Sequence, residues 1–427
     1  MAIGKEGALA GLRVLDFTWV YAGPFATRQL ADLGAEVIKV DRYKIGAIER
    51  HYFLEIEAEG VRQSSYATSL NRGKKSLCID IRSRKGRDIM LELVRKSDVL
   101  IENMSPGTME KCGLGYDDVK RVNSGIIYCS ISCFGQYGPY SNEPGFDIIA
   151  QAASGWIGQA DPPNQAPLAI GDCTAGIHAT TAILAALYYR EKTGVGQYID
   201  ISMTDCLFHL HEANPPAYLF SKRQVLPKPV GRWHSTYSPY AVLKGRDGFI
   251  AVGAITQDLW LLLVKAMGKE YEWLFSDPRT ERLERRLTAE NAPFVHQTIE
   301  DWLMKFDSVK DAERVLKDAG VPCMRIKSWT EVVDDPHTKA REMVVKMEQP
   351  FLGEIEAYGS PFKMSATFSG VRGHAPLIGE HNDEILCTLL DYSHKEIEAL
   401  YTNEVIYKEE AVDRLPDQFR QGRMYNK

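Results

Sequence analysis

The amino-acid sequence predicts an α/β fold, in which helices cover both faces of a doubly wound parallel sheet. Short apolar segments of strand type alternate with amphipathic helical segments through the N-terminal half of the chain. The chain has 427 residues, which is too long for one ordinary single-core domain. This length favours two structural units or one elaborated α/β unit.

The first strand–helix–strand unit lies near the start of the chain. We expect an apolar strand over residues 11–18 and a helix over residues 25–35, whose apolar residues share one side. Gly34 ends this helix as a C-terminal cap would. Residues 36–42 form a second strand. This order is typical of the βαβ unit of a parallel sheet.

The same alternation continues along the chain. We expect further strands over 76–81, 98–103, 125–135 and 197–203, and helices over 85–97, 116–124, 176–194 and 204–213. Doubly wound sheets bind ligands at the carboxyl ends of their strands, in the loops that follow. The loops 19–24, 40–44 and 102–107 are therefore candidate ligand-binding segments.

A second domain is expected where this alternation stops. Residues 214–232 contain four prolines, and we interpret them as a crossing between domains. Residues 240–254 resemble a β-hairpin around Gly245 and Gly248. For the rest of the chain we expect helices over 257–268, 294–319 and 382–400, a strand over 320–326, and β-rich segments from about residue 337.

The composition favours a globular protein of the cytoplasm. The net charge is −6 without a basic block, which argues against nucleic acid as a partner. The eight cysteines form no CxxC pair, and Cys129 and Cys133 lack the further ligands of a metal site. Scattered thiols suit a reducing compartment. We see neither a signal peptide nor an apolar run long enough to cross a bilayer, so no membrane partner is expected.

Asp172 is the first candidate functional residue. It stands in PLAIGDCTAG, directly before an apolar helix. One interpretation is an ordinary N-cap, a position that favours aspartate. The other is a nucleophile: a helix N-terminus stabilises an anion, which would keep this carboxylate ionised and able to attack a carbonyl. The small neighbours Gly171, Cys173, Ala175 and Gly176 would then let a bulky substrate approach.

Several cations follow or precede the predicted strands. Each of them fits a solvated surface, but together they could bind phosphates at one edge of the sheet; they are Arg42, Lys74, Lys75, Arg82 and Lys111. The first strand is not followed by GxGxxG, and no P-loop is present, so a dinucleotide or triphosphate site lacks its usual backbone cradle. Trp19 is expected to pack in the core or at an interface.

Taken in order, several long motifs resemble those of the family III CoA-transferases, the relatives of formyl-CoA:oxalate CoA-transferase. That family also includes carnitine and bile-acid CoA-transferases and α-methylacyl-CoA racemase. The motifs are GLRVLDFTWVYAGPFATRQLADLGAEVIKVDR, NRGKKSLCIDI, ENMSPGTMEKCGLGYDDV, SCFGQYGPYSNEPGFDIIAQAASG and GDCTAGIHATTAILAALYYREKTGVGQYIDISMTD, followed late in the chain by GVPC, DDPH and APLIGEHNDEIL. The resemblance covers most of the chain.

The resemblance implies an architecture. It implies a Rossmann-like large domain formed by both ends of the chain, a small central α+β domain, and an interlocked dimer. We therefore expect 1–214 to be the N-terminal, CoA-binding part of the large domain, 215–232 a linker, 233–330 the small domain, and 331–427 the return to the large domain with a C-terminal tail. A homodimer is expected, and a heteromer with a paralogue stays open.

The resemblance also implies a reaction. The family's catalytic aspartate falls on Asp172, which would form a mixed anhydride and then an aspartyl-CoA thioester while CoA passes from an acyl-CoA donor to a free acid. Coenzyme A is then a substrate, and neither a permanent cofactor nor a metal is required. The positions expected to contact CoA or to lie beside the reacting centre are Tyr21, Ala22, Arg42, Ile79, Asp80, Ile81, Arg82, Asn103, Met104, Ser105, Lys111, Phe146 and Asp147.

Departures from the family's patterns bear on the substrate and the reaction. Tyr21 replaces the glutamine of the oxalate enzyme, and we see no glycine run over 225–265 like its mobile loop. We therefore expect a larger, more apolar acid. Phe146 stands where the racemases have a histidine base, and phenylalanine cannot act as a base. An acyl-CoA racemase or isomerase remains an alternative, as does a CoA-binding partner subunit of a heteromeric transferase.

Overall fold

A computed structural model describes residues 6–226, 231–234 and 237–419 of the protein. The chain divides into two compact units. The first comprises Met1–Trp156, Ala166–Leu210 and Pro336–Lys427, and the second comprises Ile157–Gln165 and His211–Asp335. The second unit thus begins before, and ends after, the expected small domain over 233–330. Residues 227–230 of the expected linker lie outside the described residues.

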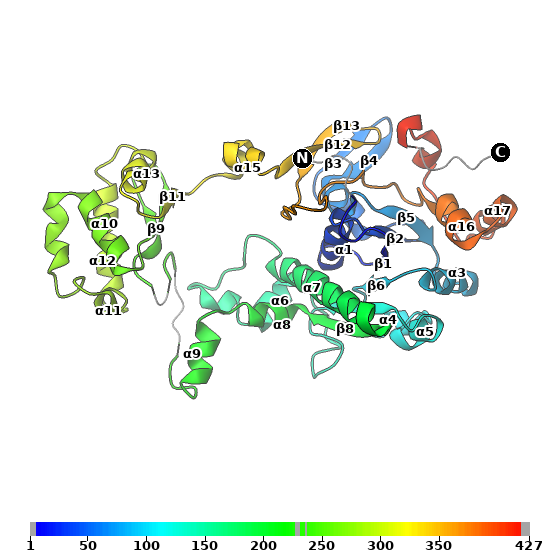
Figure 1. Ribbon diagram of the computed structural model, residues 1–427, viewed down its shortest axis with the longest axis horizontal. Helices are drawn as coiled ribbons and strands as arrows, with labels where there is room; N and C mark the ends of the chain where they lie inside the picture. Colours follow the sequence, from blue (N-terminus) through cyan, green and yellow to red (C-terminus); the bar gives the residue numbers. More distant parts are fainter. Residues whose placement is uncertain (1–5, 227–230, 235–236, 420–427) are drawn as a thin grey trace. The chain divides into compact units, whose positions relative to one another are not determined.

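The first unit contains a six-stranded sheet in which every pair of neighbouring strands is parallel. Its strands follow the order β5-β2-β1-β6-β7-β8, so the order reverses beside β1 (Figure 1). All six predicted strands of this half are present; one has the predicted bounds, 36–42, and the other five are shorter than predicted. They are β1 (Arg13–Phe17), β2 (Glu36–Arg42), β5 (Lys75–Ile79), β6 (Val99–Glu102), β7 (Ile127–Ser132) and β8 (Gln197–Ser202). The predicted parallel sheet is confirmed.

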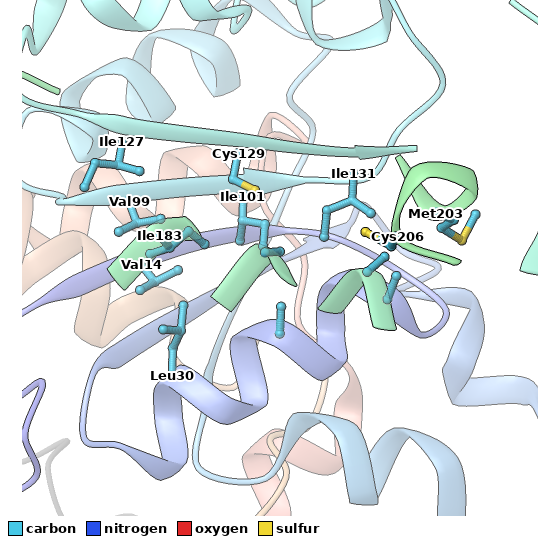
Figure 2. Packing of buried hydrophobic residues seen from close by; sticks show 14 of the residues in the cluster. Val14, Leu30, Val99, Ile101, Ile127, Cys129, Ile131, Ile183, Met203 and Cys206 are labelled. Carbon is cyan, nitrogen blue, oxygen red and sulfur yellow. The ribbon is translucent and has the colours of Figure 1, made fainter. Parts of the chain in front are cut away.

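One face of the sheet is covered by α1 (Ala22–Asp32), α7 (Ile170–Thr193) and α8 (Met203–His209). Side chains from four central strands meet these helices in one apolar cluster (Figure 2). Helices α1 and α7 approach closely because Gly176 has no side chain: a Cβ there would lie 2.7 Å from the Ala22 carbonyl oxygen. The head of α7 is therefore held directly against the start of α1.

The other face is covered by α3 (Arg84–Val94), α5 (Tyr116–Val122) and two helices from the end of the chain, α16 (Asn382–Leu390) and α17 (His394–Thr402). The end of the chain also completes the edge strand β5. The backbone N–H of Cys78 donates to Asn382 Oδ1 at 2.9 Å, and the N–H of Asp80 donates to the Val405 carbonyl at 2.8 Å. Both ends of the chain therefore build the unit that carries the sheet.

Helix α7 corrects one sequence expectation. Its 24 residues are long and apolar enough to cross a membrane by length and composition alone. Its inward face, however, packs in the sheet core through Ala175, Ala179 and Ile183, which are fully buried. A core helix passes the same test of length and composition, so α7 is weak support for a membrane span.

Several short elements of the first unit were not predicted. They are the antiparallel hairpin β3 (Glu55–Ala58) and β4 (Val61–Ser64), then α2 (Ser65–Asn71), α4 (Thr108–Lys111), α6 (Asp147–Ala153) and α15 (Pro336–Ala340). Strand β3 has only four residues and is mostly exposed, so its brief alternation of glutamate with Ile56 and Ala58 is a weak strand signal. The β-rich segment after residue 337 is the antiparallel pair β12 (Val344–Gln349) and β13 (Gly353–Tyr358).

The second unit has its own core around a three-stranded antiparallel sheet of β9 (Tyr240–Lys244), β10 (Phe249–Gly253) and β11 (Cys323–Arg325). The predicted hairpin is confirmed. The helix predicted over 294–319 is two helices, because Ser308 caps the second by accepting the N–H of Lys310. The helices of this unit are α9 (Asn214–Phe220), α10 (Gln257–Met267), α11 (Leu283–Arg286), α12 (Ala292–Leu303), α13 (Val309–Asp318) and α14 (Trp329–Asp334).

Candidate functional site

A cavity of about 260 Å³ opens at the point where the strand order of the sheet reverses. The loops that follow β1 and β6 meet there. The N–H of Trp19 donates to Asn103 Oδ1 at 2.9 Å, and Asn103 Nδ2 donates to the Trp19 carbonyl at 2.8 Å. Trp19 lines the cavity and is partly exposed, so it is not a core residue, and its expected place at an interface stays a prediction. This is the position at which doubly wound sheets bind ligands.

The loop after β1 is held from below by buried charges. Lys39 and Glu49 are fully buried and pair at 3.2 Å. Glu49 also accepts the backbone N–H of Val20 at 3.0 Å, and the Lys39 ammonium donates to the Thr18 carbonyl. Val20 has a φ of 65°, a left-handed conformation that is strained for a β-branched residue. The buried pair therefore holds the cavity loop in a conformation it would not adopt alone.

A second buried pair supports the same loop. Lys74 Nζ lies 3.0 Å from Asp16 Oδ2, and both side chains are fully buried. Burial alone would raise the pKa of Asp16, but Lys74 and Lys39 hold it well below its usual range. Burial lowers the pKa of Lys74 to about 8, against the attraction of Asp16. Lys74 is thus a structural cation, and the hypothesis that it binds phosphate is wrong.

Asp172 faces the cavity from the first turn of α7. Ala169 occupies the N-cap position and Asp172 is the third residue of the helix, so the N-cap interpretation is wrong. The capping carboxylate belongs to Asp147, in the first turn of α6. Its Oδ1 accepts the N–H of Gly171 at 2.7 Å and that of Asp172 at 3.1 Å. Asp147 therefore caps α7, and the side chain of Asp172 lines the cavity.

The electrostatics of Asp172 differ from the expectation. Burial, followed by the charge of Asp147, raises its pKa to about 7, and only the backbone N–H of Ala22 opposes the rise. A helix N-terminus was expected to keep the carboxylate ionised, but desolvation and a second carboxylate outweigh it. Near neutral pH a large share of Asp172 is still ionised, and that carboxylate is poorly solvated. This combination is characteristic of a reactive group.

The small residues around Asp172 serve packing instead of substrate access. A Cβ at Gly171 would lie 2.9 Å from Asp147 Oδ1, so this glycine admits the capping carboxylate. Gly176 admits α1, and Ala175 is fully buried in the core. Cys173 lies beside the Tyr21 hydroxyl, which it contacts through its thiol. The expectation that these positions open a path for a bulky substrate is wrong for the three buried ones.

The structure gathers part of the predicted residue set at the cavity. Its wall includes Ala22, Asn103, Met104, Ser105, Phe146 and Asp172. Tyr21 does not line it; this residue precedes α1 and stacks on Phe25 with ring centroids 5.3 Å apart. Phe146 is 70% exposed at the start of α6, and Asp147 stands behind Asp172. The structure thus brings part of the predicted set together around Asp172.

The remaining predicted residues lie away from the cavity. Arg42 ends β2 and Ile79 ends β5, and the two are register partners, so Ile81, Asp80 and Arg82 follow at the same edge. Ile79 is buried, and Asp80 accepts the backbone N–H of Arg82. Arg42, Arg82 and Lys111 are exposed.

Lys75 is at the opposite edge. It begins β5 and pairs with Glu36 at 2.6 Å and with Glu384 at 2.8 Å. Parallel strands present their carboxyl ends at one edge and their amino ends at the other. Lys75 therefore cannot join Arg42 in a common phosphate site, and that hypothesis is wrong for this residue.

Sequence reasoning missed Glu102, the last residue of β6. Burial raises its pKa to about 7, although Ser130 and the backbone N–H of Met104 oppose the rise. The only sign of Glu102 in the sequence is that a glutamate stands at the end of an apolar strand. Within the described ranges no group of three or more His, Cys, Asp or Glu side chains could hold a metal ion.

Comparisons with known proteins agree with this geometry. The family model "CoA-transferase family III" matches residues 9–382. Succinyl-CoA:mesaconate CoA-transferase of Haloarcula hispanica is 35% identical over 89% of this chain and 96% of its own length. Formyl-CoA:oxalate CoA-transferase of Streptomyces avermitilis is 34% identical over 93% of this chain and 99% of its own.

A solved structure shows the same fold. The crystal structure of a CAIB/BAIF family protein from Brucella suis has a TM-score of 0.78 and 30% identity, and the match covers 90% of this chain and all of that one. The family match over most of the chain, and the cavity with Asp172 at the reversal of the parallel sheet, lead to one assignment. The chain belongs to CoA-transferase family III and is an enzyme of the transferase type that acts on CoA thioesters.

Proposed function

We propose that Asp172 is the nucleophile that carries CoA between two acids. In the first step a carboxylate oxygen of Asp172 attacks the thioester carbonyl of the donor acyl-CoA. The carbon–sulfur bond breaks, CoA leaves as a thiolate, and an acyl–aspartyl anhydride remains. The thiolate then attacks the aspartyl carbonyl and expels the donor acid as a carboxylate. The product of this half-reaction is an aspartyl-CoA thioester.

The second half reverses these steps with a new acid. A carboxylate oxygen of the acceptor attacks the aspartyl thioester, and the thiolate leaves again. The thiolate then attacks the acceptor carbonyl of the new anhydride, which releases Asp172 as a carboxylate and forms the new acyl-CoA. Each step exchanges one activated acyl group for another, so protons and electrons balance without an external reagent. The observation that carries the proposal is a desolvated Asp172, with a pKa of about 7, facing the cavity.

The position of CoA follows from the edge of the sheet. We place the pantetheine arm along Asn103, Met104 and Ser105, which line the cavity. The exposed cations Arg42, Arg82 and Lys111 would face the phosphates, with Ile79 to Ile81 near the adenine. Support for this comes from their common location after the carboxyl ends of β2, β5 and β6. Lysine at position 111 would act as a point charge, because it cannot bind a phosphate oxygen pair bidentately.

The assembly and location of the enzyme are also proposals. We propose a homodimer, interlocked as in the family, because exposed apolar side chains gather on α6 and α7; they are Phe146, Ile148, Ile149, Ile177, Tyr188 and Tyr189. A cytoplasmic location is supported by eight free cysteines, four of them buried. A heteromer with a paralogue is the alternative assembly.

The acids are expected to be larger than oxalate. The rings of Tyr21 and Tyr66 are tilted against each other with centroids 5.6 Å apart, and they bring aromatic surface close to Asp172, whose charge contributes to the raised pKa of Tyr66. The relatives named above act on succinyl, mesaconyl, formyl and oxalyl groups, and succinyl-CoA is therefore the first donor to test. A panel in which oxalate gave the highest kcat/KM would contradict the larger acid.

The test is to trap the acyl-enzyme. The protein is incubated with succinyl-CoA, treated with hydroxylamine and examined by intact mass spectrometry and peptide mapping. We expect a hydroxamate on the peptide that contains Asp172, and none in Asp172→Asn.

Asp205→Asn is the matched control. Asp205 is also the third residue of a helix, α8, but it is exposed. The adduct should persist in this variant. An adduct that survives in Asp172→Asn would overturn the nucleophile. Deuterium uptake at the α-carbon of an acyl-CoA without any adduct would favour the racemase alternative instead.

A further inference from the structure

A buried arginine, Arg72, and a partly exposed one, Arg28, share a single carboxylate behind the active-site helix α1. Arg72 is 1% exposed, and its Nη2 donates to Asp32 Oδ2 at 2.7 Å. Its Nε and Nη1 are buried, as is Nε of Arg28, and none of the three has a hydrogen-bond partner among the described residues. Two guanidinium groups therefore face one carboxylate, which leaves one positive charge uncompensated.

Such an arrangement is unfavourable in an empty protein. A buried charge without a partner is strongly destabilising, and each unsatisfied donor adds to the cost. Burial, together with the nearby charge of Arg72, lowers the pKa of Arg28 below its usual value. Within the described part of the chain, Arg28 makes neither an ion pair within 4 Å nor a hydrogen bond. Arg28 and Arg72 therefore form a cationic site that has fewer carboxylates than guanidinium groups.

The site is connected to the reacting centre through α1. Tyr21, Phe25 and Arg28 are spaced by four and three residues and so share one face of the helix. The Arg28 guanidinium carbon lies 4.7 Å from the centroid of the Phe25 ring, which in turn stacks on Tyr21. The Tyr21 hydroxyl contacts Cys173, the neighbour of Asp172. An aromatic surface therefore runs from the nucleophile to the free guanidinium.

The spacing along α1 sets the length of this surface. Arg28 stands seven positions after the N-cap Tyr21, a rise of about 10 Å along the axis. Side chains in a helix lean back toward its N-terminus, so the Arg28 head lies nearer to Tyr21 than its Cα does. A planar guanidinium binds a carboxylate by two parallel hydrogen bonds. The aromatic rings would contact the methylene groups between the two ends of the ligand.

We propose that Arg28, backed by Arg72, binds the far carboxylate of a dicarboxylic acyl group while the near carboxylate or thioester meets Asp172. This inference rests on the proposed function and names the substrate class of the same site. The acid is larger than oxalate, and its far end is charged instead of apolar. Asp32 orients Arg72 and thereby leaves the fork of Arg28 to the ligand.

The first test compares two donors with equal carbon chains. Succinyl-CoA carries the second carboxylate, and butyryl-CoA lacks it. In Arg28→Met we expect kcat/KM for succinyl-CoA to fall roughly 10–100-fold, the range for a hydrogen bond to a charged group, while that for butyryl-CoA stays within about threefold. Arg28→Lys should fall between wild type and Arg28→Met for succinyl-CoA. An equal loss for both donors, or a wild type that prefers butyryl-CoA, would overturn the subsite.

A binding test keeps the subsite separate from the chemistry. Free glutarate should raise the Tm of the wild type and of Asp172→Asn, but not that of Arg28→Met, and butyrate should raise none of them. The exposed Arg121→Met is the matched control and should respond like the wild type. Because this readout needs no turnover, failure of the Asp172 adduct with intact glutarate binding would remove the proposed mechanism alone. Equal shifts with glutarate in Arg28→Met and wild type would remove the subsite alone.

Discussion

Two buried aspartates near the start of α1 have opposite surroundings. Asp16 is fully enclosed at β1, where Lys74 lies 3.0 Å away and Thr27 donates a hydrogen bond at 2.6 Å. These partners hold its pKa far below the usual range. Asp172, at the head of α7, has another carboxylate as its neighbour, and its pKa rises to about 7. The same side chain is thus a fixed structural anion in one place and a titrating group in the other.

The difference shows that this fold keeps its structural ion pairs apart from the carboxylate that faces the cavity. The cations are placed beneath the loop, where they hold Asp16 and Glu49, and none of them contributes to the raised pKa of Asp172. A cation beside Asp172 would stabilise the carboxylate and make it a weaker nucleophile. The proposed reactivity of Asp172 therefore depends on the absence of a cation among the groups that shift its pKa. The predictions below test that separation.

The largest effect is expected at Asp172, the proposed nucleophile. Asp172→Asn should lower the rate of CoA transfer by at least about 1,000-fold, since the covalent route is lost. The same change should stabilise the fold. Asp172 binds its proton more tightly when folded, so its ionisation costs stability as pH rises from about 4 to 7, and the amide removes that cost. We expect a gain on the order of 2 kcal/mol at pH 8 and almost none at pH 4, measured by urea unfolding.

The buried cation should show the reverse behaviour. Lys74→Met leaves Asp16 charged and without its ion-pair partner, and should cost about 3–5 kcal/mol in unfolding free energy. Adding Asp16→Asn should restore part of that loss, because the unpaired charge is removed as well. Urea unfolding of the single and double variants measures both values. A Lys74→Met protein as stable as the wild type would show that the pair does not support the loop.

The pH dependence of activity should report the neighbour of Asp172. With a pKa of about 7, the wild type should be about tenfold slower at pH 6 than at pH 8, because only the carboxylate attacks. Asp147→Asn removes the like charge, so the acid limb of kcat/KM should move to lower pH and the tenfold ratio should shrink. The amide oxygen can still accept the two backbone N–H groups. An unchanged profile would mean that burial alone sets the pKa.

The smallest effect is expected from Gly171→Ala. Its Cβ would lie 2.9 Å from Asp147 Oδ1 and 3.2 Å from Leu207, so the carboxylate has to move back by a fraction of an ångström. The acid limb should then shift in the same direction as in Asp147→Asn, but by less. Comparison of the two pH profiles at equal enzyme concentration is the measurement. A shift larger than that of Asp147→Asn would contradict the assigned contact.

The local sequence pattern was sufficient to predict the strands of the sheet and to single out Asp172 as a candidate. The alternation of apolar strands and amphipathic helices predicted all six parallel strands, and PLAIGDCTAG directed attention to the carboxylate. The pKa of Asp172 could not be predicted, because Asp147 is 25 residues away and folds back onto the same helix end. Lys74 and Lys75 were misassigned because residues adjacent to a strand in sequence can lie at either edge of the sheet.

The hydrogen bonds that the end of the chain makes to β5 have a consequence for the folding of the protein during translation. Until residues near Val405 have left the ribosome, the N–H groups of Cys78 and Asp80 lack their partners and the edge of the sheet is open. An open edge strand is a template for pairing with another chain. The second unit, which is encoded in between, can form its own core during that interval. The nascent enzyme is therefore most exposed to aggregation late in translation. A premature stop before the final helices would leave a nearly full-length protein with an open sheet edge that is prone to aggregation.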